Sequence, residues 1–374
     1  ENSGSLQIEE AGKGILRQGD FFRNPTYGTM TSAAVQFSYF EYIAGNISSA
    51  LINVTSLPML VWPVLSGKFG FAETSSAMMA ASRTAINGME RNPRYKNLYQ
   101  TLMDHGQLEH TVSREVLEGR RQTTGQYFGL YGRMMDALSI PFAATERYNR
   151  GVTAIAAYDL ARAKGMNEAD AVRYALNTVK DIHTSGMSAT APRWMQHPIG
   201  RVFFTFKSFV WNSAFVTARA FYNAFKGETP DVRRAAQRQL LGMYGMTMAF
   251  AGIKGMPFYG AVSTLATMLN AMFGDDEPFD LNETLRQFFG ELFYKGFFNY
   301  ATNLEVANRT GIAIDLLFRD DPRGIAEHGY VLSAMQQAFG PLGSYAVNAE
   351  RGIKAMAEGQ VARGVESLLP SWVR

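Results

Sequence analysis

The stretch Asn167-Glu-Ala-Asp-Ala-Val-Arg-Tyr-Ala-Leu-Asn-Thr-Val-Lys-Asp181 shows the character of the fold most clearly. Its apolar residues recur at the spacing i, i+3, i+4, i+7, which places them on one face of an α-helix. These residues are Val172, Ala175, Leu176 and Val179. Asn167 stands where the N-cap of such a helix is expected, and Asp170 occupies the capping-box position. The stretch therefore predicts an amphipathic helix with one buried face.

The same helical period dominates the rest of the 374-residue chain. A second stripe, in Asn282–Tyr300, consists of Leu285, Phe288, Phe289, Leu292, Phe293, Phe297 and Tyr300. No sustained period-2 run rich in β-branched residues points to strands. Helix-breaking residues lie at Thr124-Gly125, Pro141, Lys164-Gly165, Ala191-Pro192, Gly227–Pro230, Asp275–Pro278, Asp320–Gly324 and Gly340–Gly343. They divide the chain into roughly ten to fifteen helices, so the sequence predicts an all-α fold, an irregular array of helices.

Two long stretches carry almost no charge, and both are interrupted by glycine or proline. Tyr42–Gly67 has no charged residue, and Gln239–Gly274 has only Lys254. The second stretch is expected to form a hairpin of two short apolar helices, each near or below the roughly 20 residues that cross a bilayer. We interpret both stretches as buried core helices of a large domain. The alternative is that they contact a membrane in one functional state.

From these patterns we expect three helical subdomains behind an N-terminal linker. Residues 1–29 are interpreted as a linker from a longer chain, since the sequence starts without Met. The first subdomain is expected to span residues 30–140 and to contain the apolar segment 42–67. The central subdomain is expected to span residues 141–238, and the C-terminal one residues 239–374 with the apolar segment 239–274.

The composition excludes several classes of functional site. The chain has no cysteine, which rules out disulfides, thiolate metal sites and cysteine nucleophiles. Two of its 5 histidines, His105 and His110, are too far apart in helical phase to share a face. No P-loop, dinucleotide-binding glycine pattern or serine-nucleophile elbow is present. We therefore predict no enzymatic activity, no cofactor and no bound metal.

Two groups of charged residues are candidates for interactions. Glu146 and Arg150 have the spacing of a helical i,i+4 ion pair, and we interpret them as a structural pair. Region 201–238 is basic and rich in aromatic residues, which suits nucleic-acid phosphates and bases or, more simply, an amphipathic helix with snorkelling charges. As possible contacts for DNA or a neighbouring subunit we single out Arg201, Lys207, Arg219, Lys226, Arg233, Arg234 and Arg238. The acidic block Asp275–Glu291 would suit them as a partner in the same or an adjacent chain.

Four stretches, taken in order along the chain, carry a resemblance to a known family. They are Tyr42–Pro58 continuing to Pro63 and Lys68-Phe-Gly70, Pro141–Arg150 with Thr153–Tyr158 and Ala161-Arg162, Pro198–Phe209, and Gly340-Pro341 followed by Ala357–Pro370. Together they resemble the C-terminal helical region of very large phage polyvalent proteins. Such proteins are often identified as internal virion or DNA-ejection proteins of short-tailed bacteriophages. The resemblance spans residues 40–374.

The resemblance implies an architectural role, without catalytic residues in this region. Such proteins are packed in the virion interior, leave through the portal and tail, and reassemble as a tube across the host envelope. We therefore expect a homo-oligomeric conduit for genome ejection that contacts other ejection and portal or tail proteins, the passing DNA and the host inner membrane. The alternative is a non-catalytic docking extension of a large virion-packaged enzyme, such as a virion RNA polymerase. A conduit needs a ring of subunits, whereas a docking extension does not.

Overall fold

A computed structural model of the chain describes residues 37–42, 44–108, 129–183, 208–256, 280–302 and 341–369, with 259, 260, 262, 263, 265 and 266 in addition. The regular structure of these residues is entirely helical, with twelve α-helices, short 3-10 and π turns and no strand. The fold is all-α, as the apolar periodicity predicts. The expected N-terminal linker 1–29 lies outside the described residues.

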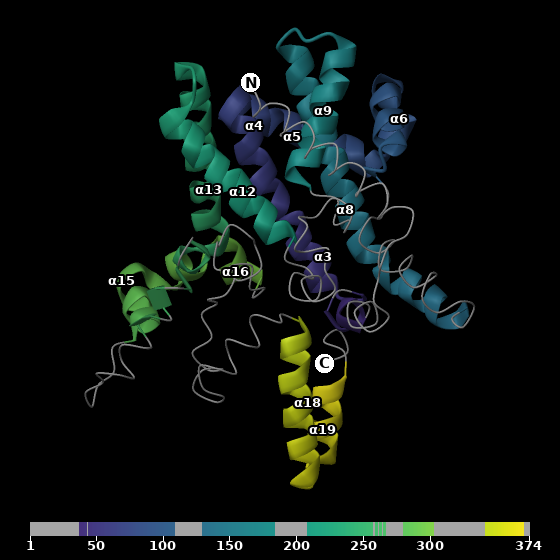
Figure 1. Cartoon of the computed structure of the whole chain (residues 1–374), viewed down its shortest axis with the longest axis vertical. Helices are drawn as coiled ribbons and strands as arrows, with labels where there is room; N and C mark the ends of the chain where they lie inside the picture. Colours follow the sequence, from purple (N-terminus) through teal and green to yellow (C-terminus); the bar gives the residue numbers. More distant parts are fainter. Residues whose placement is uncertain are drawn as a thin grey trace, which may run out of the picture.

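The helices form a succession of packed neighbours rather than a symmetric bundle (Figure 1). α12 (Ser208–Lys226) packs on α13 (Pro230–Ala251), and α13 packs on α4 (Trp62–Phe69). α4 contacts α5 (Phe71–Asn87), which in turn packs along α8 (Gly129–Ala163). The succession ends with α9 (Glu168–Ile182) against α8, and α6 (Lys96–Asp104) against α9. Helices from distant parts of the sequence thus share one core.

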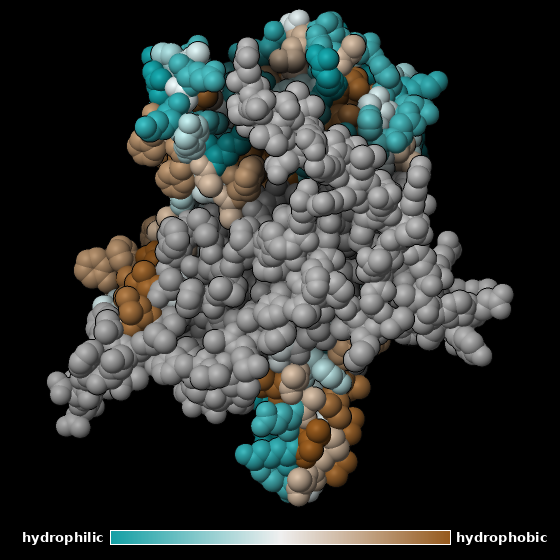
Figure 2. Space-filling view, viewed as in Figure 1, coloured by the Kyte–Doolittle hydropathy of each residue, from teal (hydrophilic) through white to brown (hydrophobic). Residues whose placement is uncertain are grey.

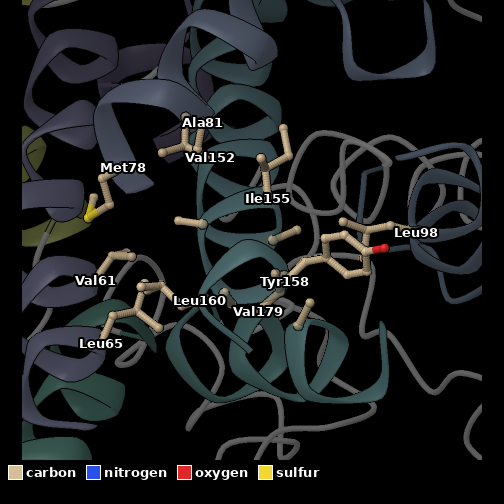
Figure 3. Close-up of a cluster of buried hydrophobic side chains, with 14 of the residues drawn as sticks. Val61, Leu65, Met78, Ala81, Leu98, Val152, Ile155, Tyr158, Leu160 and Val179 are labelled. Carbon is tan, nitrogen blue, oxygen red and sulfur yellow. The ribbon is translucent and has the colours of Figure 1, made fainter. Parts of the chain in front are cut away.

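That core is centred on α8, whose side chains meet residues from η1, α4, α5, α6 and α9 (Figure 3). Val152 and Ile155 of α8 are completely buried, and so are Val61 and Leu65 from the charge-poor segment. The remaining contacts come from Met78 and Ala81 of α5, Leu98 of α6 and Val179 of α9. Burying these side chains supplies the main free energy that opposes the entropy of the unfolded chain.

The helix predicted from Asn167–Asp181 is confirmed as α9. The Asn167 side chain accepts a hydrogen bond from the backbone N–H of Asp170 at 2.8 Å, as an N-cap does. All four apolar residues of the predicted face are buried, and Ala171 and Ile182 extend that face. The expected break at Lys164-Gly165 is also present, since α8 ends at Ala163 and Gly165 has a φ of 84°.

The first charge-poor stretch forms one nearly continuous helical segment in the core. It begins with α3 (Ile47–Val54), where Asn46 caps the first turn through the N–H of Ser49. The π turn η1 (Leu57–Val61) leads directly into α4. The stretch was expected to be interrupted by its prolines, but Pro58 and Pro63 lie within helical turns. Ile47–Phe69 is the one span in the described residues long and apolar enough to cross a membrane, and 50% of its most apolar window is buried.

The two charge-poor stretches cover each other, because α4 lies directly against α13. A Cβ atom at Gly67 would lie 2.6 Å from the Ala235 carbonyl oxygen, and one at Gly242 would lie 3.2 Å from Pro63 Cβ. Glycine at both positions allows the helices to approach closely. In this structure η1, α4 and one side of the end of α13 contribute to the core, whereas α3 leaves Ile47 and Leu51 exposed. Most of the second arm of the expected 239–274 hairpin lies outside the described residues.

Two of the expected subdomain boundaries fall inside helices. The boundary at 140/141 lies within α8, which continues through Pro141, and the boundary at 238/239 lies within α13. Proline normally ends a helix because it removes a donor and crowds the preceding turn. Here the Leu138 carbonyl, in that preceding turn, accepts a hydrogen bond from the Gly45 N–H at 2.7 Å. This hydrogen bond holds α8 to the chain before α3 beside the proline, and α8 continues where the sequence predicts a break.

Two short 3-10 turns connect α5 to α6 and are tied to α8. They are η2 (Met89–Arg91) and η3 (Pro93–Tyr95). Arg94 forms a 2.8 Å ion pair with Asp159 of α8, and the Tyr95 hydroxyl donates to the same carboxylate at 2.9 Å. Burial and the adjacent Asp159 charge raise the pKa of Tyr95 to about 12, so this hydroxyl stays a donor at neutral pH.

The predicted helix in 282–300 is interrupted twice, at Gly290 and at Gly296. α15 (Leu281–Lys295) has a non-helical residue at Gly290, and α16 (Phe297–Thr302) starts after Gly296. Gly296 meets Gly252, which ends α13 just before the turn η5 (Ile253–Gly255). Both glycines have positive φ, and a Cβ on either would lie 2.4 Å from the backbone nitrogen of the other. The ends of α13 and α15 therefore touch backbone to backbone.

The last two helices form a hairpin that projects from the rest (Figure 1). α18 (Pro341–Ala357) and α19 (Val361–Leu368) cross where Gly352 faces Gly364, and a Cβ on Gly364 would lie 2.7 Å from the Gly352 carbonyl oxygen. The ring of Tyr345 packs edge-on against Phe37 at a centroid distance of 4.5 Å. This contact joins the hairpin to the helical residues 37–42.

Candidate functional site

The basic region predicted from the sequence is a helical hairpin of α12 and α13. Its turn follows from local chemistry: Thr229 caps α13 by accepting the N–H of Val232 at 3.2 Å, and Pro230 occupies the first turn. Gly227 is required because a Cβ there would lie 2.5 Å from the Asn223 carbonyl oxygen. Arg233 closes the turn by donating to the Gly227 carbonyl at 2.7 Å.

Five of the seven predicted contact residues lie in this hairpin. Arg219 and Lys226 are exposed on α12, and Arg234 and Arg238 are exposed on α13. Arg233 is half-buried and bound to the turn, so the hairpin itself uses its guanidinium. The remaining two predicted residues, Arg201 and Lys207, lie outside the described residues.

The four exposed cations have no ion pair or hydrogen bond with any residue that the structure describes. We had considered the acidic block Asp275–Glu291 as their partner. In the described part of that block, Glu291 pairs with Lys295 at 2.9 Å and with Arg286 at 3.5 Å, both in α15. Asp280 caps α15 by accepting the backbone N–H groups of Asn282 and Glu283. These carboxylates therefore serve α15 and not the basic hairpin.

The two sides of α12 differ in residue size in an unusual direction. The buried side carries small residues, and the exposed side carries large aromatic ones. The buried residues are Ser213, Thr217, Ala220 and Ala224. The exposed ones are Phe215 at 69%, Phe221 at 39%, Tyr222 at 66% and Phe225 at 77%. Exposed large apolar residues grouped in this way indicate an interaction surface rather than random surface composition.

Phe225 has the highest exposure of the four aromatic residues, and the sequence did not single it out. Its spacing from Phe221 and Tyr222 is a sequence signal that could have found it, since residues three or four apart lie side by side on a helix. What the sequence could not show is that these rings point outward. Phenylalanine is more often buried than exposed.

Glu146 and Arg150 belong to a polar stripe on the inner side of α8. Asn149 donates to the Asn53 carbonyl at 2.8 Å and to Ser56 at 3.1 Å. Arg150, which is buried, donates to the Gln107 carbonyl at 3.0 Å. The stripe therefore fastens α3 and the chain after α6 to α8.

The charges in this stripe influence one another. Burial raises the pKa of Glu146, and the positive charge of Arg150 opposes that rise. Burial also lowers the pKa of His183 to about 3, with a further contribution from Arg150. The His183 ring is therefore neutral, and its Nε2 lies 2.8 Å from Thr153 Oγ1. The group resembles a catalytic cluster in its shifted pKa values, but its hydrogen bonds connect helices and turns.

A shallow hollow of about 290 Å³ lies on the opposite side of α8, beside η2. Its polar lining includes Glu90, Arg91 and Arg147. This volume is at the lower end of small-molecule pockets, which span about 300–1,000 Å³. In the described residues, no group of three or more His, Asp and Glu side chains is placed to hold a metal ion.

Two further surfaces expose large apolar side chains. The α15–α16 surface carries most of the predicted 282–300 stripe, namely Phe288, Phe289, Leu292, Phe293, Phe297 and Tyr300. The α18–α19 hairpin has one apolar side with Ile353, Val361, Val365 and Leu369. Figure 2 shows hydrophobic surface over α15 and along one side of this hairpin, with hydrophilic residues on the hairpin's other side.

Comparison with protein-family models, with curated proteins and with solved structures gives no match for this chain. The arrangement of its own residues therefore carries the functional argument.

Proposed function

We propose that this chain is a non-catalytic structural segment of a phage internal virion protein, and that its copies assemble into a conduit for genome ejection. One observation carries the proposal: large apolar side chains are exposed on three separate surfaces, on α12, on α15–α16 and on α18–α19. A subunit with neighbours on several sides requires several such surfaces. A monomer that works alone would leave them all in water.

Mass photometry of the 374-residue chain over a range of protein concentrations tests the assembly. We expect a closed species of defined mass, because a conduit is a ring. Phe293→Ser and Val365→Ser should each weaken assembly about tenfold or more, since each removes a large apolar contact from an interface. Ile86→Ser is the matched control, because Ile86 is exposed on α5, away from all three surfaces. A chain that stays monomeric at every concentration would instead support the docking extension of a virion enzyme.

The exposed cations of the hairpin, which have no ion pair among the described residues, support weak contact with DNA in this conduit. Arg234→Gln together with Arg238→Gln should reduce the salt slope of duplex DNA binding by about two, at about 0.9 for each phosphate contact. Arg233→Gln is a useful contrast, since Arg233 holds the turn and should affect hairpin stability first. Binding should be weak and independent of sequence, because a conduit must let DNA pass. If the double substitution leaves DNA binding unchanged but prevents assembly, these arginines contact a neighbouring subunit.

A further inference from the structure

The exposed side of α12 has a regular pattern of aromatic and basic residues. Phe215, Arg219, Tyr222 and Lys226 follow one another at i, i+4, i+7, i+11 and form one stripe along the helix. The small buried residues Ser213, Thr217, Ala220 and Ala224 have the same spacing, offset by two positions. Since each residue turns the helix by about 100°, the two stripes lie on opposite sides.

The small stripe explains why the large residues are outside. Side chains no larger than threonine let α12 approach α13 closely, and the Gln237 side chain reaches the Ala224 carbonyl at 3.4 Å. Phe221 and Phe225 form a second row beside the exposed stripe. Among the aromatic rings that the structure describes, Tyr244 of α13 lies 6.0 Å from Phe221, and none lies beside Phe225. The exposed face of α12 is therefore convex and aromatic, with cations along one edge.

We propose that this face of α12 docks on an anionic lipid bilayer, with the helix lying in the plane of the membrane surface. Phenylalanine rings on such a helix enter the boundary between headgroups and acyl chains. Tyrosine is favoured at the same depth, because its ring is apolar and its hydroxyl reaches water. Arg219 and Lys226 extend from the edge of the face toward lipid phosphates, with which their positive charges are complementary. This inference deepens the proposed function by naming the partner of one of its three surfaces.

The same face fits nucleic acid or a second copy of the chain less well. Bases stack on aromatic platforms that are set in a basic groove, whereas these rings stand on the convex side of a helix. A second copy would bring Arg219 and Lys226 close to their own counterparts, and α12 carries no acidic residue to pair with them. An anionic bilayer offers an apolar boundary for the rings and phosphates for the cations at the same surface.

Vesicle sedimentation of the full 374-residue chain measures this docking. We expect binding to phosphatidylcholine vesicles that contain phosphatidylglycerol, and much weaker binding to phosphatidylcholine alone. Arg219→Gln with Lys226→Gln should weaken binding about 25-fold, at about fivefold for each cation near an anionic surface. Phe215→Ser with Phe225→Ser should weaken binding at least tenfold. All four side chains are exposed, so these variants keep the core intact.

Two control variants separate α12 from a general effect of charge or apolar surface. Lys164→Gln removes an exposed cation beyond the end of α8, and Phe288→Ser removes a ring from α15 that is 80% exposed. Both should bind vesicles like the wild type. The proposal is wrong if the α12 variants bind vesicles normally, or if Phe288→Ser weakens binding as much as they do. It is also wrong if the α12 variants lose only DNA binding or only self-assembly, which would assign the face to those partners.

The absence of cysteine allows a second measurement that reports depth directly. Tyr222→Cys gives a single site for an environment-sensitive fluorophore on the exposed face of α12, and Lys164→Cys gives the control site. With phosphatidylglycerol-containing vesicles, the probe at position 222 should brighten, shift to the blue and be quenched by lipids brominated on their acyl chains. The probe at position 164 should show none of these changes. Identical spectra at the two sites would overturn the proposal even if the assembly of subunits proceeds as proposed.

Discussion

Replacing Gly67 with alanine is expected to destabilise this protein, although the same change stabilises most helices. The gain from helix propensity is about 1 kcal/mol. A Cβ at this position would lie 2.6 Å from the Ala235 carbonyl oxygen and 2.9 Å from Gln239 Cβ. Both atoms are fixed to the backbone of α13 and cannot rotate aside, so overpacking takes the upper part of its usual range of about 1–3 kcal/mol. The net loss should be about 2 kcal/mol.

Gly245→Ala provides the matched control on the other helix of the pair. Gly245 lies inside α13, and a Cβ there would have no atom within 4 Å. This variant should gain about 1 kcal/mol, from helix propensity and from the restricted unfolded chain. The two variants should therefore differ by about 3 kcal/mol, or roughly 4 °C in thermal midpoint followed by circular dichroism, because the unfolding entropy of a chain of 374 residues is large. A Gly67→Ala protein as stable as the wild type would refute the close approach of α4 and α13.

Arg150→Met should lower the free energy of unfolding by about 3 kcal/mol, because it leaves Glu146 partly buried without its positive neighbour; urea unfolding measures this, and Glu146→Gln in the same background should restore part of it. His183 binds a proton more weakly when folded, with a pKa of about 3 against 6.5 unfolded. Its contribution to stability is therefore complete above about pH 6.5 and declines by about 1.4 kcal/mol per unit down to about pH 3. His183→Gln should remove this part of the pH slope, and an unchanged slope would mean that the ring is solvated in the folded chain. Asn167→Ala should destabilise α9 by about 1 kcal/mol in the same unfolding assay, and no loss would show that the cap contributes nothing.

Helix type and helix ends could be predicted where the signal is local. α9 follows from its apolar spacing and its Asn167 cap, and the turn before α13 follows from Gly227 and Pro230, because these effects act within a few residues. The break predicted at Pro141 was wrong, and the contact beside it is not local in the sequence. The donor at Gly45 that bonds next to it is far away in the sequence, and no local pattern shows it.

The direction in which an apolar face points was the harder part of the prediction. The stripe in 282–300 was recognised as one helical face, yet in the structure much of it is in water on α15 and α16. Periodicity gives the face of a helix but does not identify what covers it. The same limit applies to the candidate site. The sequence singled out the basic residues of 201–238 but did not show what their side chains or the neighbouring rings face. Neither the binding of Arg233 to Gly227 nor the outward aromatic rings of α12 could be read from residue order.

The contact between Gly252 and Gly296 has a consequence for how sequences of this kind can diverge. Each position excludes a side chain twice, once through its positive φ and once through the backbone of the other glycine. A change at one position cannot be compensated at the other, because neither constraint is relieved by altering the partner. Homologues that keep this junction should therefore have glycine at both positions. Those that lose one glycine should also change the length of the segment between α13 and α15, which makes the pair a marker for this arrangement of helices.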